Sequence, residues 1–425
     1  MNTTRRIAVL LVLPALVTAF LGQMANGESA RREQNATLLP STMGSNTHEA
    51  FRLASFNPVM THPTQAEDFP GSWCIPSTNT RLKLGGYVKL DAIYDLNEIG
   101  DRFNLLTPTI PTTMDRGGRT TFHARQTRIF IDTRSPTCLG TLRTYIEADF
   151  FGPGNSLRLR HAYGETPRLL AGQTWTTFMD PSANPYTLDF EGPPGMVFRR
   201  QAQLRYKLPL TDQLKMAFAV ESPDSAVDFV GGGDNLDRSP DFISNVRYEG
   251  HGGHVQFAGI VRDIGFRALA GPTAGIAQHE TGYGFTVSGS LKTFGKDRFK
   301  GQYARGKGIG HYFEDLNAGG VATDGGADAF GNLELLDADG WFVAYEHHWN
   351  TCLRSNFVYG AGSVDNSVGQ PNTAFQESEY VAANLIYTPI KQMDLGIEYL
   401  YGTHVDAANN RGEANRIQLS AIFRF

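Results

Sequence analysis

The sequence predicts an all-β chain, a transmembrane antiparallel β-barrel of about sixteen strands with short turns at one end and long loops at the other. Three observations support this: the alternation in the last residues, a series of similar segments, and connections that alternate in length. Residues 414–425 place Ile417 and Leu419 on one face and Arg416 and Gln418 on the other. A strand shows this pattern because its side-chain period is two.

Segments of this kind follow one another through residues 81–425, the predicted barrel domain. The contrast is clear in residues 142–150, where Leu142 and Ile146 oppose Arg143. Only alternate residues of a barrel strand face lipid, so a long apolar run is not needed. The other predicted strands are residues 82–94, 121–134, 157–163, 169–175, 197–208, 214–220, 242–248, 255–261, 283–291, 298–303, 341–349, 353–359, 380–387, 395–401 and 414–425.

The predicted connections alternate between short and long. Short turns are expected at residues 135–140, 165–167, 209–212, 250–253, 295–297, 350–352 and 388–391. Longer loops are expected at residues 98–118, 176–195, 222–240, 264–280, 306–339, 361–379 and 404–413, with one short link at 152–155 on that side. Short periplasmic turns and long external loops are typical of outer-membrane barrels. Closure follows because unpaired backbone groups in hydrocarbon cost several kcal/mol each.

Residues 1–27 have the layout of a secretory signal peptide. Two arginines precede an apolar run over residues 7–21, and small residues follow at Ala25 and Gly27, which predicts cleavage before Glu28. A membrane-anchoring helix is the alternative reading. The run is interrupted by a proline, however, and its roughly fifteen apolar residues fall short of the twenty or so that a spanning helix needs.

Residues 28–80 contain several prolines and no sustained period, so we expect a mostly irregular periplasmic linker. The chain has three cysteines, too few for a disulfide scaffold. A bridge between Cys74 and Cys138 would leave Cys352 unpaired, and three unpaired cysteines are equally compatible with the sequence.

Hydropathy and charge narrow the class of protein. The mean hydropathy is -0.29 and no later apolar run reaches spanning length, which excludes a helical membrane protein. The net charge of -5 gives no indication of nucleic-acid binding.

Several motifs together resemble the DcaP-like porins of Gram-negative outer membranes. They are LKLGGYVKLDAIYD (82–95), HARQTRIFIDTRSPT (123–137), RTYIEADFFG (143–152), RLRHAYGE (158–165), GQTWTTFMDP (172–181), FRRQAQLRY (198–206), YEHHWN (345–350) and LRSNFVYG (353–360). The resemblance covers residues 80–425. It implies a homotrimer in the cell outer membrane, surrounded by lipid and lipopolysaccharide. It also implies passage of small hydrophilic solutes, with a preference for anions such as dicarboxylates. Members often carry a helical segment before the barrel, but residues 28–80 lack the heptads for one.

The polar face of the early strands is rich in arginine. If the apolar face meets lipid, the polar face lines a water-filled bore, where guanidinium groups attract carboxylates. Arg125 and Arg128 fall in opposite registers, so only one of them faces the bore unless the strand is bulged. The arginines in the polar register of their own strands are Arg143, Arg158, Arg160, Arg199 and Arg205.

The long loop at residues 176–195 follows the fifth strand, the position from which general porins fold a loop into the barrel. It carries Asp180, Asp189 and Glu191. Acidic groups on this loop that face wall arginines would set up a transverse field across the narrowing. The alternative is that these charges pair with one another and hold the loop in place.

Other candidate sites have weaker support. His347 and His348 are adjacent on a strand and point to opposite faces, so we expect no metal site and no cofactor. The acidic loop that contains Asp324, Asp328, Glu334, Asp337 and Asp339 is expected to be a solvated external loop, with calcium bridging to lipopolysaccharide as the alternative. No GxSxG or HExxH motif is present, so we expect no enzymatic activity.

The sequence therefore predicts a passive diffusion channel with an arginine-lined bore. Two alternatives remain open at this stage. An outer-membrane barrel hydrolase would need a shielded nucleophile, for which His161 and Ser420 are candidates that nothing in the sequence pairs. A secreted β-rich binding protein would be soluble without detergent.

Overall fold

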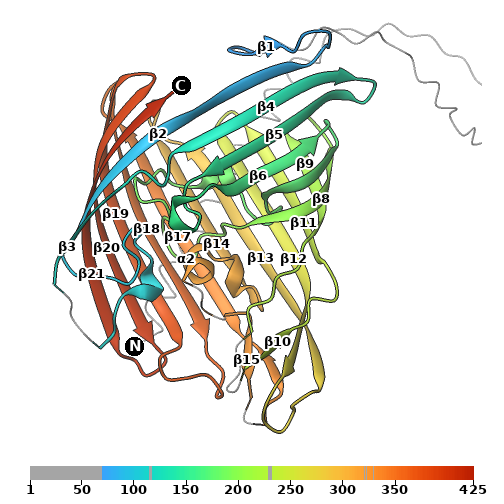
Figure 1. The fold of residues 1–425 in the computed structure, drawn as a ribbon, viewed down its shortest axis with the longest axis vertical. Helices are drawn as coiled ribbons and strands as arrows, with labels where there is room; N and C mark the ends of the chain where they lie inside the picture. The colour runs from blue at the N-terminus through green and yellow to red at the C-terminus, as the bar shows by residue number, and fades with distance from the viewer. Residues whose placement is uncertain (1–68, 114–116, 228–231, 320, 322, 329) are drawn as a thin grey trace, which may run out of the picture. The chain divides into compact units, whose positions relative to one another are not determined.

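Sixteen antiparallel strands form a closed barrel (Figure 1). The computed structural model describes residues 69–113, 117–227, 232–319, 321, 323–328 and 330–425. All of them belong to residues 60–425, one of the two compact units into which the chain divides. The expected signal peptide and most of the expected linker lie outside the described residues. Among those described, no helix is long and apolar enough to cross a membrane.

Each predicted strand has a counterpart in the barrel, and the strand predicted at residues 121–134 is divided into two. The strands in chain order are β2 (Arg81–Asp95), β3 (Arg119–His123) with β4 (Arg128–Thr137), β5 (Gly140–Asp149), β6 (Arg158–Glu165), β7 (Leu169–Trp175), β8 (Arg200–Pro209), β9 (Leu214–Glu221), β11 (Asp241–Gly250), β12 (Gly253–Ala268), β13 (Ala277–Lys292), β14 (Arg298–Lys307), β17 (Asp337–His348), β18 (Leu353–Asp365), β19 (Phe375–Ile390), β20 (Met393–Asp406) and β21 (Arg411–Arg424).

Shorter elements lie in the connections. They are the strands β1 (Trp73–Cys74), β10 (Gly233–Asn235), β15 (Gly325–Ala327) and β16 (Leu333–Leu335), the 3-10 helices η1 (Thr107–Thr109), η2 (Pro153–Asn155), η3 (Pro181–Ala183) and η4 (Gly310–Tyr312), and the helix α2 (Glu314–Ala318). β1 was not expected from the sequence; it pairs with the start of β2, within residues 28–80, for which an irregular linker was predicted. Cys74, Cys138 and Cys352 are all free thiols.

The last strand closes the barrel on the first. β21 pairs with β2 in a register that sets Asp91 opposite Ser420 and Asp95 opposite Arg416. On β21, Leu419 is 50% exposed on the outer face, whereas Arg416 on the inner face is fully buried. A soluble protein shows the reverse arrangement. The outside is therefore a lipid-facing surface, as the alternation predicted.

The strands at the long-loop end extend beyond their predicted limits. On β12, Val261 is the last large apolar side chain on the outer face, and Asp263 follows it there. From that point the inner face is apolar, because Ile264 and Phe266 pack on Leu333 of β16. The outer-apolar alternation marks only the lipid band, so sequence reading ended the strand too early.

The strand predicted at residues 121–134 is interrupted between β3 and β4. The amide of Thr127 donates to the carbonyl of Ala124 at 3.1 Å and closes a turn. This turn shifts the register, so that both Arg125 and Arg128 face the interior. Arg125 lies over the ring of Phe103, and Arg128 lies 5.8 Å from the ring of Phe190. The interruption therefore has the effect expected of a bulge, which is to let both arginines face the bore.

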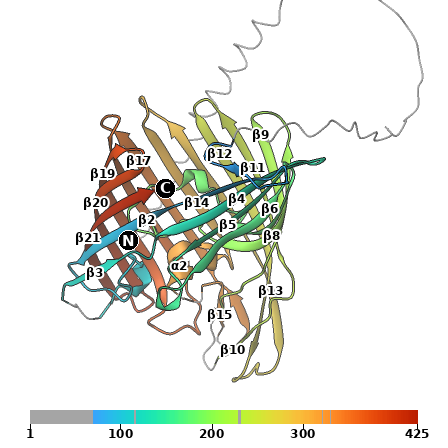
Figure 2. The ribbon, with the colours of Figure 1, turned by 45° about the horizontal axis from the view of Figure 1, so that its top comes forward.

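Two loops fold into the barrel rather than outward. The first, residues 176–199 between β7 and β8, is called the inner loop below. The second, residues 308–336 between β14 and β17, is called the second inner loop and contains α2, which Figure 2 shows inside the ring of strands. Apolar side chains of both loops form one buried cluster with the wall at β11, β12, β14 and β17 to β19. This half of the bore is packed, so open space lies toward the other wall.

Candidate functional site

The base of the inner loop is fixed by Asp180. Its buried carboxylate accepts hydrogen bonds from Arg247 at 2.8 Å, from Nε2 of His254 at 2.7 Å and from the hydroxyl of Ser288 at 3.1 Å. Burial acts to raise the pKa of Asp180, but the hydrogen bonds and charges of His254 and Arg247 outweigh it and hold the pKa below its ordinary value. Asp180 therefore remains ionised and anchors the loop.

The tip of the inner loop is fixed to the opposite wall. The carboxylate of Glu398 on β20 accepts the amides of Leu188 at 2.9 Å and Asp189 at 2.7 Å. The ammonium group of Lys89 on β2 donates to the carbonyl of Leu188 at 2.6 Å. The carboxylate of Asp189 accepts the amides of Leu105 and Gly192, and burial raises its pKa. With base and tip both held, the loop is a rigid partition.

A close glycine contact lets the inner loop lie flat on the wall. Gly195 has a φ of 73°, a conformation that favours glycine. A Cβ atom at this position would collide with the backbone of Gly340 on β17 and of Ala361 on β18. The third support of the loop therefore depends on the absence of a side chain.

The second inner loop is locked to the first and to the wall. Its Tyr312 carbonyl accepts the amide of Phe198, and its Glu314 amide donates to the carbonyl of Met196, both at 3.0 Å. Asp324 is fully buried and pairs with Arg262 of β12 at 3.1 Å. The expectation that Asp324 belongs to a solvated loop is wrong, because its segment packs inside the barrel. Glu334 and Asp337 are exposed as expected.

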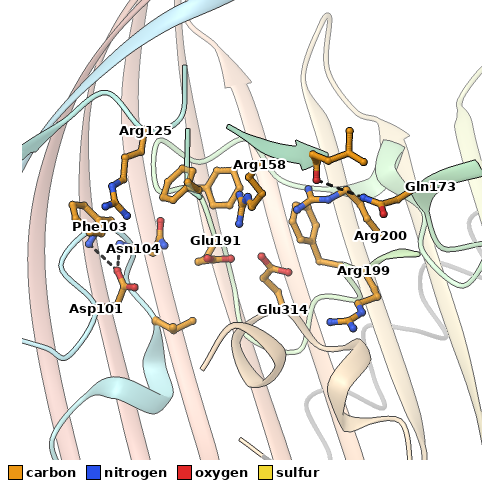
Figure 3. A pocket seen from close by; sticks show the side chains of 15 residues that line it. Asp101, Phe103, Asn104, Arg125, Arg158, Gln173, Glu191, Arg199, Arg200 and Glu314 are labelled. Atoms are coloured by element: carbon orange, nitrogen blue, oxygen red, sulfur yellow. Dashed lines mark hydrogen bonds between the residues drawn. The ribbon is translucent and has the colours of Figure 1, made fainter. Parts of the chain in front are cut away.

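A cavity of about 490 Å³ remains between the two loops and the wall formed by β3 to β8. Its charged lining comes from seven side chains. Arg125, Arg158, Arg199 and Arg200 lie on or beside the wall strands, whereas the acids come from three loops, Asp101 after β2, Glu191 on the inner loop and Glu314 on the second. In Figure 3, Arg125, Arg158 and Arg200 lie across the cavity from these acids. The arrangement is a passage with charges of opposite sign on its two sides.

Aromatic rings hold the guanidinium groups in place. Arg125 lies over the ring of Phe103 at 3.9 Å, and Arg158 lies 5.5 Å from that of Phe190. Cation–π contacts of this kind fix a charge without neutralising it. The guanidinium of Arg200 lies 4.8 Å from the ring of Trp175, and its buried Nη1 has no hydrogen-bond partner among the described residues.

Residues 64–425 match the sequence profile of the DcaP outer membrane protein family. The chain belongs to this family. A solved structure of the outer membrane channel DcaP of Acinetobacter baumannii superposes with a TM-score of 0.72 at 22% identity, covering 84% of this chain and all of that one. OmpT, an outer membrane protein of Vibrio cholerae, gives a TM-score of 0.52 at 14% identity, covering 81% and 98%. A search of curated proteins found no match.

At these identities the structural likeness shows the fold, and the family match shows the compartment. This DcaP-family protein is a multi-pass β-barrel of the cell outer membrane with a porin-type fold. The resemblance noted in the sequence is thereby confirmed, as are the fold class and the outer-membrane location.

The structure separates the predicted site residues of this DcaP-family barrel into two groups. Arg125, Arg158, Arg199 and Glu191 line the cavity. The other predicted residues lie in the wall or anchor the inner loop. In the wall, Arg143 pairs with Asp132 and Glu165, and Arg160 pairs with Glu147 and Asp149. Arg205 hydrogen-bonds to Gln203 and Trp175, and Asp180 and Asp189 anchor the inner loop. The inner loop thus combines both readings of its charges, because two acids hold it down and one faces the passage.

Sequence reasoning missed Arg200, Asp101 and Glu314. Arg200 is the first residue of β8, so Arg199 still belongs to the loop and both can turn toward the cavity, against strict alternation. Glu314 was assigned to an external loop. The apolar residues beside it, Tyr312 and Phe313, are unusual for a solvated loop and were the available signal.

The discounted sites gain no support. His347 and His348, at the end of β17, both approach Asp297 in the adjacent turn. Among the residues that the structure describes, no cluster of His, Cys, Asp and Glu suits a metal ion. His161 on β6 contacts Thr174, and Ser420 on β21 donates to Asp91, so the two candidates for a hydrolase lie on strands that do not pair.

Proposed function

We propose that this barrel is a passive diffusion channel that favours small anions. The observation that carries the proposal is the pair Arg125 and Arg200, cationic side chains at the cavity for which the described residues provide no carboxylate within ion-pair distance. Arg158 and Arg199, by contrast, have Asp149 and Asp224 as partners. The wall of the passage therefore carries an excess of positive charge that a solute can use.

Geometry supports selection by charge and size together. The cavity of about 490 Å³ holds on the order of sixteen waters at ~30 Å³ each, so a small hydrated solute fits and a large one does not. The guanidinium groups come from three places, the β3–β4 link, β6 and the start of β8. A solute with two carboxylates can contact more than one of them, and this supports a preference for dicarboxylates.

Two further proposals come from the sequence and the family resemblance. We propose that the protein is a homotrimer, and that residues 1–27 are cleaved before a periplasmic linker that ends near residue 80. Chemical crosslinking of unheated, detergent-purified protein tests the first, and N-terminal sequencing of the mature protein tests the second.

Ion selectivity tests the function directly. Purified protein in a planar bilayer under a KCl gradient should give a reversal potential of the sign that chloride selectivity produces. Liposome swelling should be faster with small dicarboxylates than with neutral sugars of equal size. A cation-selective reversal potential would refute the anion preference. Esterase activity without any ion conductance would instead favour the hydrolase alternative.

A further inference from the structure

Two acidic side chains from different loops meet at the cavity. Glu191 of the inner loop and Glu314 of the second inner loop are 6% and 5% exposed, and their carboxyl groups are hydrogen-bonded to each other. Figure 3 shows both in the middle of the acidic side of the passage. An ionised carboxylate can only accept hydrogen bonds, so a direct bond between two carboxyl groups requires a proton on one of them.

Backbone contacts hold the two loops together beside the pair. Glu314 donates its amide to Met196 of the inner loop, and a β-bridge joins Val197 to Phe313. Oε2 of Glu191 is buried, and no donor group of the described residues hydrogen-bonds to it. Two like charges held together in this way cannot both be ionised at low cost.

The ionisation behaviour agrees with this geometry. Burial raises the pKa of Glu191 to about 7. Burial, together with the adjacent Glu191 carboxylate, raises the pKa of Glu314 well above its ordinary value. Near neutral pH the pair therefore changes between no negative charge and one.

Several charged groups face the pair from the surrounding elements. Asp189 and Asp315 come from the loops themselves, Asp101 from the connection after β2, Arg158 from β6 and Arg200 from β8. Arg125 and Arg199 complete the charged lining of the cavity, and His123 at the end of β3 contacts Phe103 beside it. Among these groups His123 is the other side chain whose ordinary titration range is near neutrality, so the experiment must separate it from the pair.

We propose that Glu191 and Glu314 form one proton-sharing unit that sets the charge of the passage and makes its anion selectivity strongest in mildly acidic solution. This rests on the proposed function. As the pH rises, the unit gains a negative charge opposite the arginines, and the advantage of anions over cations falls.

The test is the chloride-to-potassium permeability ratio in planar bilayers between pH 5.5 and 8.5. We expect the wild-type ratio to fall about eightfold with a midpoint near neutrality, because one unit charge about 7 Å from the permeating ions acts on chloride and on potassium in opposite directions. In Glu191→Gln and in Glu314→Gln the midpoint should move to higher pH, because the remaining acid no longer shares its charge and its proton with a second carboxyl group. In the double variant the dependence should vanish and the ratio should stay at its acidic value.

Two control variants separate the Glu191–Glu314 pair from the other titratable groups. Glu334→Gln, an exposed acid on the same loop as Glu314, should behave as wild type, and so should His123→Gln. Heat-modifiable gel mobility shows which variants are folded, and if the double variant fails to fold, the two single variants decide. A midpoint unchanged in both single variants, or lost in His123→Gln, would overturn the proposal. An anion-selective channel without any pH dependence would remove the inference alone, whereas a channel without anion selectivity at acidic pH would remove the proposed function.

Discussion

Arg158 offers the sharpest test of selection by charge. Its guanidinium lies at the cavity and makes two hydrogen bonds to Asp149, at 3.0 and 2.8 Å. Arg158→Ala removes one positive charge from the passage and little else, because Asp149 keeps Arg160 at 2.9 Å and the amide of Phe151 at 3.1 Å. The buried carboxylate remains paired, and the fold should persist.

The expected magnitude follows from Coulomb's law. A unit charge about 7 Å from a permeating ion in water contributes about 0.6 kcal/mol, which favours chloride and disfavours potassium by the same amount, so the ratio of the two changes by a factor of about eight. We therefore expect the chloride-to-potassium permeability ratio of Arg158→Ala to be about eightfold lower than that of the wild type, measured from reversal potentials at low salt. At high salt the difference should shrink as the charge is screened.

A matched variant separates the local effect from the overall change in charge. Arg168 is exposed in the turn between β6 and β7, away from the cavity, and Arg168→Ala removes the same charge. It should leave the ratio unchanged. Equal ratios in wild type and Arg158→Ala, or equal losses in both variants, would show that the charge of Arg158 does not select ions.

Three further predictions concern the supports of the inner loop. Asp180→Asn should lower the unfolding temperature and increase current noise, because breaking a buried ion pair costs about 3–5 kcal/mol; Asp212→Asn in an exposed turn is the control. Burial acts to raise the pKa of Asp180, but its hydrogen-bonded cations hold the pKa below the ordinary 3.8. The stabilisation by ionised Asp180 is therefore complete above pH 3.8 and is lost as the pH falls below that value. Current noise of the wild type should rise in acid, whereas that of Asp180→Asn should not. Glu398→Ala leaves two inner-loop amides without their acceptor, each costing about 1–3 kcal/mol, and should raise single-channel conductance, whereas Glu413→Ala on the exposed face of β21 should not. Gly195→Val introduces a collision and a strained backbone worth about 1–3 kcal/mol, and a variant with wild-type heat stability and conductance would contradict the fit of the loop to the wall.

The strands were predicted correctly wherever every second residue faces lipid. On β21, Leu419 and Phe423 face outward and Gln418 and Ser420 face inward, as the alternation required. The same alternation located each strand, because a segment that lies in a bilayer needs an apolar outer face and a fully hydrogen-bonded backbone. Beyond the lipid band the rule no longer applies, and there β12 continues past the predicted end.

Sequence alone could not assign the charged side chains of the interior. Arg160 and Arg158 share the polar face of β6, but Arg160 is buried between two carboxylates and Arg158 reaches the cavity. Which arginine is neutralised depends on partners from the neighbouring strand β5. Glu314 is a similar case, because only the folding of its loop into the barrel brings it to Glu191.

The amino-acid sequence by itself determined that the chain is a lipid-embedded barrel with a polar, arginine-rich interior, because period-two alternation is a local property that can be read one strand at a time. Only the tertiary structure decided where the passage lies and which charges line it. Two loops far apart in the chain, residues 176–199 and 308–336, fill one half of the bore and supply two of the three acids at the cavity, Glu191 and Glu314. Their positions depend on contacts such as Asp180 with His254 and Asp324 with Arg262, which join residues that no local pattern connects.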